Sequence, residues 1–260
     1  MEKTPILKLL LKLSIPVMFA LLIQSAYNII DSYFVSQYSS EGLTALAIIF
    51  PIQLLMTAMS TGTGTGLNIL ISRMDGYKNN DQGNVIKSGL FLGLFNYIVF
   101  TIIMMLFINL YFNVSSDNNV VISQGIIYAH IVFIGSFGLF IEAIGTKLLQ
   151  AKGNMLLPML AQIIGAVINI VLDPILISKQ GISGAAIASI TGQIVAMLIT
   201  LYGIFKIYKG KGHIQFQHCL EIYKLGLPSI IMQSLYTLYI VGLNLILKQF
   251  TEDAVTVLGI

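Results

Sequence analysis

Charged side chains are scarce in this sequence. Lys, Arg, Asp and Glu make up 10% of the 260 residues, whereas soluble domains carry about 25%. Hydrophobic residues make up 56%, and the mean hydropathy is +0.87. These values exclude a soluble domain and indicate an integral membrane protein whose surroundings are a lipid bilayer. The net charge of +3 is too small and too dispersed for a nucleic-acid partner.

Tryptophan is absent and cysteine occurs once. The aromatic belt at the membrane interfaces must therefore come from tyrosines. A lone cysteine excludes an intramolecular disulfide, and the flanks of Cys219 are typical of a cytoplasmic segment, so we expect a free thiol. The sequence contains no pattern typical of a catalytic nucleophile with its base, and no His/Cys metal-site spacing. We therefore expect neither an enzyme nor a bound cofactor.

Seven stretches are long enough to cross a bilayer, which takes about 20 residues as a helix. The first is too long for a signal-peptide core and has no cleavage site after it, so we expect it to remain as a membrane helix. The fold class predicted is an all-α integral membrane protein. The stretches are Leu13–Tyr38, Leu43–Ser72, Ser88–Phe112, Val120–Thr146, Met155–Ser178, Ile182–Phe205 and Leu225–Phe250.

The distribution of basic residues predicts the orientation. With the N-terminus inside, 12 of the 14 Lys and Arg residues fall in cytoplasmic segments, and only Lys179 and Lys248 fall outside. Such a bias follows the positive-inside rule. We predict a multi-pass protein of the cell membrane with a cytoplasmic N-terminus.

A short internal repeat links the first and seventh stretches. Lys12-Leu13-Ser14-Ile15-Pro16 recurs 212 residues later as Lys224-Leu225-Gly226-Leu227-Pro228. Six helices separate the two copies, so both point the same way, as in transporters built from parallel repeats. We expect residues 1–212 to form a six-helix lobe with its cytoplasmic connecting loop. Residues 213–260 would begin a second such lobe, most of which lies beyond this sequence.

Two acidic residues fall inside the apolar stretches at similar depth. Asp31 lies about seven residues before the outer end of the first helix, and Asp173 about five before that of the fifth. Asn169 precedes Asp173 by one helical turn, and Thr191 lies about nine residues into the sixth helix. Pro174 cannot donate a backbone hydrogen bond and therefore frees a carbonyl nearby. Ligands that are all oxygens suit a hard cation.

Asp31 shares a helix face with Gln24 and Tyr27, which lie seven and four residues before it. Intramembrane acids generally serve function, although hydrogen bonding between helices or a position near the headgroups is an alternative. We interpret Glu142, close to Lys147, as an interfacial or paired residue. The glycines from Gly62 to Gly66 indicate close helix packing rather than a phosphate loop.

The sequence resembles the N-terminal half of the multidrug and toxin extrusion (MATE) family. The matching motifs cover nearly all of residues 13–250, and their order and spacing are typical of that family. They are Leu13-Ser14-Ile15-Pro16, Asp31-Ser32-Tyr33-Phe34-Val35, Gly62-Thr63-Gly64 to Ser72-Arg73, Gly153 to Pro158, Asn169 to Pro174, and Gly181-Ile182-Ser183-Gly184-Ala185-Ala186-Ile187-Ala188.

The resemblance implies a twelve-helix transporter of two lobes that exports cationic drugs in exchange for Na⁺ or H⁺. In its archaeal and DinF-like members, the first lobe holds a cation or proton site. By resemblance this site falls on Asp31, Asn169, Asp173 and Thr191, and Gln24 and Tyr27 belong to the same network. NorM-like members use a glutamate on the seventh helix, but this chain has no acid between Lys224 and Glu252.

Two alternatives remain beside a cation-coupled drug antiporter. A flippase of lipid-linked precursors would share a related fold, but anionic headgroups require basic residues in the cavity, and all 14 lie at helix ends or in loops. The other is a non-transporting membrane fragment or accessory subunit, which would fit a chain that ends soon after its seventh helix.

Overall fold

The computed structural model describes residues 6–76, 81–208, 212–247 and 249. These residues form α-helices joined by short connections and contain no β-strand. The expected all-α class is confirmed. The helices in chain order are α1 (Ile6–Tyr38), α2 (Ser40–Gly76), α3 (Gln82–Ser115), α4 (Asn119–Gly135), α5 (Phe137–Ala151), α6 (Leu156–Gln180), α7 (Ile182–Ile207) and α8 (Phe216–Leu247).

Six of these helices are each long and apolar enough to cross a membrane, and the pair α4 and α5 would form a seventh span. The stretch predicted over Val120–Thr146 therefore corresponds to this bent pair rather than to one continuous helix. The structure divides it at Ser136, where α4 and α5 meet at a bend of 46°. Hydropathy alone does not detect this break, because both halves are equally apolar.

The bend has a local cause in the sequence Gly135-Ser136-Phe137-Gly138. The backbone N–H and the hydroxyl of Ser136 both donate to the carbonyl of Phe133, which tightens the last turn of α4. Kinks are common at such Gly/Ser pairs. A Cβ at Gly135 would lie 2.3 Å from the Ile190 side chain of α7, so the lack of one allows the two helices to touch.

The ends of the first and last helices differ from those predicted. α1 begins at Ile6 rather than Leu13, and α8 begins at Phe216 rather than Leu225. The added residues at the start of α8 mix apolar and polar side chains, with Cys219 and Ile222 buried and Leu220 exposed, so a hydropathy window misses them. The predicted end of the last helix, at Phe250, lies outside the described residues.

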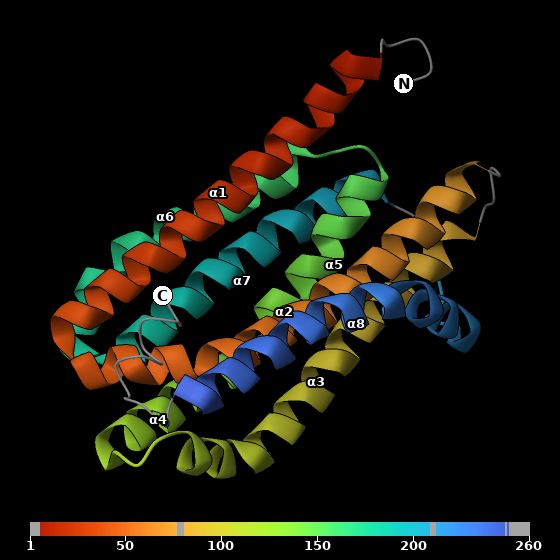
Figure 1. Ribbon diagram of the computed structural model, residues 1–260. Helices are drawn as coiled ribbons and strands as arrows, with labels where there is room; N and C mark the ends of the chain where they lie inside the picture. The colour runs from red at the N-terminus through yellow and green to blue at the C-terminus, as the bar shows by residue number, and fades with distance from the viewer. Residues whose placement is uncertain (1–5, 77–80, 209–211, 248, 250–260) are drawn as a thin grey trace.

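The helices pack as two groups that share a centre. α1 runs beside α6, and α6 packs closely along α7, whereas α2 is flanked by α3 and α8 (Figure 1). A tight turn at Gly181, whose φ of 60° favours glycine, reverses the chain between α6 and α7. α4 and α5 both contact α2 and α7 and thereby join the two groups.

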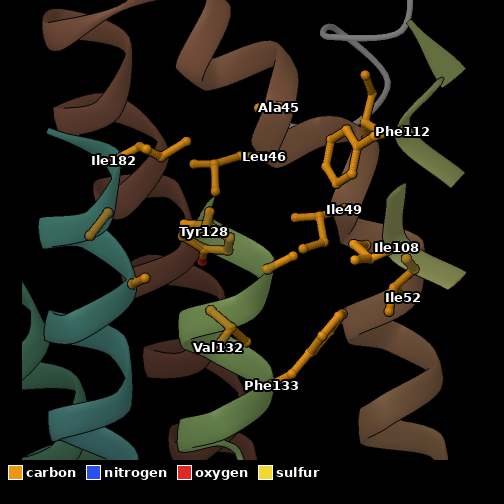
Figure 2. Packing of buried hydrophobic residues seen from close by; sticks show 14 of the residues in the cluster. Ala45, Leu46, Ile49, Ile52, Ile108, Phe112, Tyr128, Val132, Phe133 and Ile182 are labelled. Carbon is orange, nitrogen blue, oxygen red and sulfur yellow. The ribbon is translucent and has the colours of Figure 1, made fainter. Parts of the chain in front are cut away.

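The main hydrophobic core lies where α2, α3, α4 and α7 meet (Figure 2). Aromatic rings fill much of it, and Phe100 and Phe133 pack edge to face with centroids 6.0 Å apart. Tyr128 belongs to this core and carries a polar group into it. The buried residues labelled in Figure 2 are Ala45, Leu46, Ile49, Ile52, Ile108, Phe112, Tyr128, Val132, Phe133 and Ile182.

The small-residue packing expected at Gly62 and Gly66 appears between α2 and α8. A Cβ on Gly66 would lie 2.0 Å from the carbonyl oxygen of Ile222, and one on Gly226 would lie 2.5 Å from that of Gly62. Thr61 donates to Gln233 across the same contact, over 3.0 Å. The first helix of the expected second lobe is therefore held against α2 by backbone proximity.

Replacing Gly226 by Ala should weaken the α2–α8 contact. The added methyl group overlaps a backbone atom and overpacks the crossing, which destabilises by about 1–3 kcal/mol. Gly242→Ala on the same helix is the matched control, because a Cβ there meets nothing within 4 Å. Alanine at 242 should raise stability by roughly 0.5–1 kcal/mol. Thermal unfolding in detergent, followed by circular dichroism, checks both; equal effects would contradict the close crossing.

Cysteine labelling tests the orientation that the basic residues predict. In a Cys219→Ser background, Lys179→Cys at the end of α6 and Lys206→Cys at the end of α7 place thiols on exposed positions. A membrane-impermeant maleimide should label position 179 in intact cells. Position 206 should react only in inverted vesicles, since the basic ends remain inside. The reverse pattern would show that the N-terminus lies outside.

Candidate cation-binding site

Helix α1 supplies the first acid of the candidate site. Gln24, Tyr27 and Asp31 fall on one face of α1, as their spacing predicts, and α1 packs along α6. Asp31 is only 9% exposed even though much of α1 is exposed. Its oxygen Oδ1 has no hydrogen-bond partner. The side chain is therefore buried between helices rather than placed among headgroups.

Helix α6 supplies the second acid together with an amide. Asn169 and Asp173 are 2% and 0% exposed. The Nδ2 group of Asn169 donates to Oδ1 of Asp173 and to the hydroxyl of Ser189 on α7, each over 3.2 Å. Pro174 lies inside α6, which continues to Gln180. Because Pro174 has no N–H, the carbonyl of Ile170 lacks its usual partner within the helix.

The two acids lie close enough to repel each other. The charge of Asp173 acts on Asp31, and neither acid takes part in an ion pair in the described part of the chain. Three buried acceptor oxygens have no donor, namely Asp31 Oδ1, Asn169 Oδ1 and Asp173 Oδ2. Burying unpaired charge is expensive. This arrangement therefore lacks positive charge, which a cation or a proton would supply.

Two polar residues beside the acids were missed in the sequence. Tyr128 on α4 is 3% exposed, and the charges of Asp31 and Asp173 both act on it. Its hydroxyl accepts a hydrogen bond from the Nε2 group of Gln53 on α2, over 3.3 Å. Both residues are polar and lie in the outer half of apolar predicted spans, at the depth of the two acids. Their polarity at that depth could have identified them from the sequence.

A close contact between α6 and α7 determines the geometry of the amide. A Cβ on Gly165 would lie 2.7 Å from the carbonyl oxygen of Gly192, and one on Gly192 would lie 2.5 Å from that of Gly165. Only glycine on both helices permits this approach, which brings Asn169 within reach of Ser189. The hydrogen bond between Asn169 and Ser189 thus depends on Gly165 and Gly192, neither of which has a side chain.

Thr191 does not take part in these contacts. Its hydroxyl donates to the carbonyl of Ile187 on its own helix, over 2.7 Å. It is also absent from the residues that line the neighbouring cavity. Ser189, two positions earlier, occupies the place beside Asn169. The structure thus brings together Asp31, Asn169 and Asp173 of the predicted set and leaves Thr191 apart.

A cavity extends from this site between α1, α5, α6 and α7. It contains about 630 Å³ of space, its open mouth included. Gln24 and Tyr27 line it, as does Glu142, which sequence reasoning had assigned to an interfacial or paired position. The lining residues are Gln24, Tyr27, Leu139, Glu142, Gln162, Gly165, Ala166, Asn169, Ser189, Gly192, Gln193 and Ala196.

The donor set favours a hard cation or a proton. In the described residues, no group of three or more His, Cys, Asp and Glu side chains gathers in a way that would hold a metal ion. The site instead combines two carboxylates with one amide oxygen and a hydroxyl. Such oxygens suit Na⁺ rather than zinc or copper, which prefer His and Cys, and a single proton would also relieve the repulsion.

Comparison with known proteins places this chain in a family. The family model MatE matches residues 16–175 of the chain. The FAD transporter of Shewanella oneidensis is 27% identical over 205 residues, which cover 76% of this chain and 45% of that protein. The multidrug export protein MepA of Staphylococcus aureus is 23% identical over 275 residues, which cover 100% of this chain and 60% of that protein.

Solved structures give the same result. The inward-facing conformation of a multidrug resistance MATE family transporter of the MOP superfamily matches with a TM-score of 0.83 and 27% identity, over 96% of this chain and 60% of that one. An outward-facing conformation under the same description matches at 0.80 and 30%, over 87% and 52%. The chain therefore spans about half the length of the proteins it matches.

Alanine substitution on α7 distinguishes the two candidate hydroxyl ligands. Ser189→Ala removes the hydroxyl that positions Asn169, so we expect the cation affinity to fall about fivefold, the effect of one lost hydrogen bond. Thr191→Ala should leave the affinity within twofold of the original. The measurement is the thermal-stability shift of the purified protein as Na⁺ is added or the pH is lowered. A larger effect of Thr191→Ala would support the ligand set implied by family resemblance.

Proposed function

Because the chain belongs to the MATE family of multidrug transporters, we propose that it exports organic cations in exchange for Na⁺ or H⁺. It would do so in the cell membrane, with its N-terminus in the cytoplasm, as one lobe and the first helix of the next. The chain spans only about half of its relatives, so the proposal concerns a transporter completed by a second six-helix lobe.

One observation carries the proposal. Asp31 and Asp173 are both buried on the packed helices α1 and α6, each has an unpartnered oxygen, and neither has an ion-pair partner among the described residues. A buried pair of like charges is unstable unless a cation or proton neutralises it. A site that needs positive charge, but holds no lysine or arginine to provide it, is suited to an exchangeable ion.

The position of Asp31 on α1 suggests how ion binding leads to movement. Gln24 and Tyr27 on the same helix line the cavity, so a shift of α1 changes the ion site and the cavity together. With both carboxylates charged, repulsion pushes α1 away from α6. A bound ion removes that repulsion and allows α1 to close on α6. Pro16 lies inside α1 near its cytoplasmic end and interrupts the helical hydrogen bonds there, which offers a point for bending.

Two conformations and one shared lobe are enough for exchange. In the outward-open state an external ion binds the acids, α1 closes, and the organic cation leaves. In the inward-open state the ion dissociates to the cytoplasm and a new cargo molecule enters. Relatives have been solved in both inward-facing and outward-facing conformations, which supports alternating access as the mode of transport.

The ratio of ion to cargo decides which gradient supplies the energy. One elementary charge that crosses 100 mV gains about 2.3 kcal/mol. If one H⁺ or Na⁺ enters for each monovalent cation that leaves, no net charge moves, and the ion gradient alone drives export. A second ion per cycle would add the membrane potential to the driving force.

The charge of the cavity argues against an anionic cargo. Of the described residues that line it, Glu142 is acidic and none is Lys or Arg. A flippase for lipid-linked phosphates needs basic groups there, and a flavin dinucleotide such as that named for the relative from Shewanella oneidensis carries a negative diphosphate. The cavity of this lobe therefore favours a cationic solute over both.

Neutralising either acid should abolish export. We expect Asp31→Asn and Asp173→Asn, each in the full-length transporter, to reduce ethidium efflux from cells at least tenfold at equal expression. The amide keeps the shape of the side chain but cannot bind or release the ion. Asp117→Asn, at an exposed position before α4, is the matched control. Efflux at the original rate by either buried variant would contradict the proposed site.

Ion replacement in everted vesicles identifies the coupling ion. Everted vesicles with Na⁺ replaced by K⁺ at fixed pH should lose ethidium transport if Na⁺ is exchanged and retain it if H⁺ is exchanged. If transport depends on neither ion, the antiport proposal is wrong.

A further inference from the structure

The cavity contains a third carboxylate that the ion site does not use. Glu142 on α5 lines it, and the hydroxyl of Thr146 donates to Oε1 of Glu142 over 2.6 Å. Gln162 on α6 also forms a side-chain hydrogen bond to it. Lys147 acts on Glu142 only through its field, because no ion pair joins them. The partners of Glu142 at hydrogen-bond distance are therefore neutral.

Glu142 lines the cavity, whereas neither aspartate does; Asp173 lies beyond it, hydrogen-bonded to the lining residue Asn169. Its partner Gln162 precedes Asp173 by 11 residues on α6, which corresponds to roughly 16 Å along the helix axis. Tyr27 lies between Asp31 and Glu142, since the charges of both act on it. The cavity thus joins two separate acidic sites, with Glu142 nearer the predicted cytoplasmic side.

The wall between these sites has a distinct chemical character. Gly165, Ala166, Gly192 and Ala196 form part of it, and none of them projects beyond a methyl group. Such a surface accepts a flat apolar body. The carboxamides of Gln24, Gln162, Asn169 and Gln193 provide neutral hydrogen-bonding groups around it, and the Oε1 atom of Gln193 is buried without a partner. Glu142 supplies the formal negative charge of the lining.

We propose that Glu142 anchors the positive nitrogen of a flat, monovalent organic cation in this cavity, while Asp31 and Asp173 hold the coupling ion. The inference rests on the proposed function for the cationic nature of the cargo. It adds that cargo and ion bind different carboxylates of one lobe rather than competing for the same pair.

The separation makes direct competition weak. Two unit charges roughly 16 Å apart, at an effective dielectric constant of about 20, lower each other's affinity by about sixfold. Stronger coupling must pass through a moving element. Helix α1 is suited to this, because Asp31 belongs to the ion site and Gln24 and Tyr27 line the cargo cavity. Cargo and ion would then exclude each other mainly through the position of α1.

A purely structural role for Glu142 makes a different prediction. In that case its bonds to Thr146 and Gln162 would only connect α5 to α6. Glu142→Gln preserves the size of the side chain and an oxygen that accepts from Thr146, so it removes the charge and little else. If Glu142→Gln lowers the affinity for a charged ligand only, Glu142 anchors the charge. If it lowers the affinity for charged and uncharged ligands equally, Glu142 serves packing.

The test is equilibrium binding to the purified full-length transporter with two probes. Ethidium is flat and cationic, and phenanthridine is its uncharged parent ring system. We expect Glu142→Gln to weaken ethidium binding at least tenfold and phenanthridine binding less than twofold. Glu142→Asp, which keeps the charge, should bind ethidium better than Glu142→Gln. Glu41→Gln is the matched control, because Glu41 lies at the far outer start of α2 beside Ser39 and Ser40.

Asp31→Asn should bind ethidium with an affinity within about sixfold of that of the original protein, but Na⁺ should no longer displace its ethidium. Unchanged ethidium binding in Glu142→Gln would overturn the anchor, as would an equal loss of both probes. Failure of the original transporter to bind ethidium would refute the proposed function itself, a result distinct from either.

Discussion

The site depends on the mutual repulsion of two buried carboxylates, for which the described residues provide no ion-pair partner. Asp31 and Asp173 are buried on the neighbouring helices α1 and α6, and each of them has an unpartnered oxygen, as has Asn169. In water such a pair would be unremarkable, but in a medium of low dielectric constant it is stable only with a counter-charge. A mobile ion, as proposed above, would supply this charge and link the occupancy of the site to the spacing of α1 and α6.

The close approach of the α6 and α7 backbones determines the geometry of the site. Gly165 and Gly192 let α6 and α7 approach until Asn169 meets Ser189, so the amide is held rigidly beside Asp173. The bend at Ser136 directs α5, and with it Glu142, toward the cavity. By contrast, α1 is mostly exposed along its length. The lobe therefore combines a rigid wall, formed by α5, α6 and α7, with one helix that is free to move against it.

Sequence reasoning predicted most of the elements but not all of their bounds. Hydropathy placed seven spans where the structure has six long helices and one bent pair, because the bilayer requires long apolar helices, but α1 begins seven and α8 nine residues before the predicted starts. It missed the division at Ser136, since the apolar character continues through the break, and the start of α8, where polar residues among the apolar ones lower the mean hydropathy. At the site, spacing on α1 and α6 predicted which residues share a face. It did not find Tyr128 and Gln53, which reach the acids only because α4 and α2 pack there.

By itself, the sequence determined that the chain is a helical membrane protein with two intramembrane acids, since composition and hydrophobic length depend on no tertiary contact. It also carried the motifs of the MATE family. Only the tertiary structure decided that Asp31 and Asp173 are both buried on helices that pack together, that Ser189 rather than Thr191 contacts Asn169, and that Glu142 lines the cavity. Helical periodicity fixes the direction of a side chain around its own axis. The rotation and approach of neighbouring helices, set here by glycines and a kink, determine what that side chain meets.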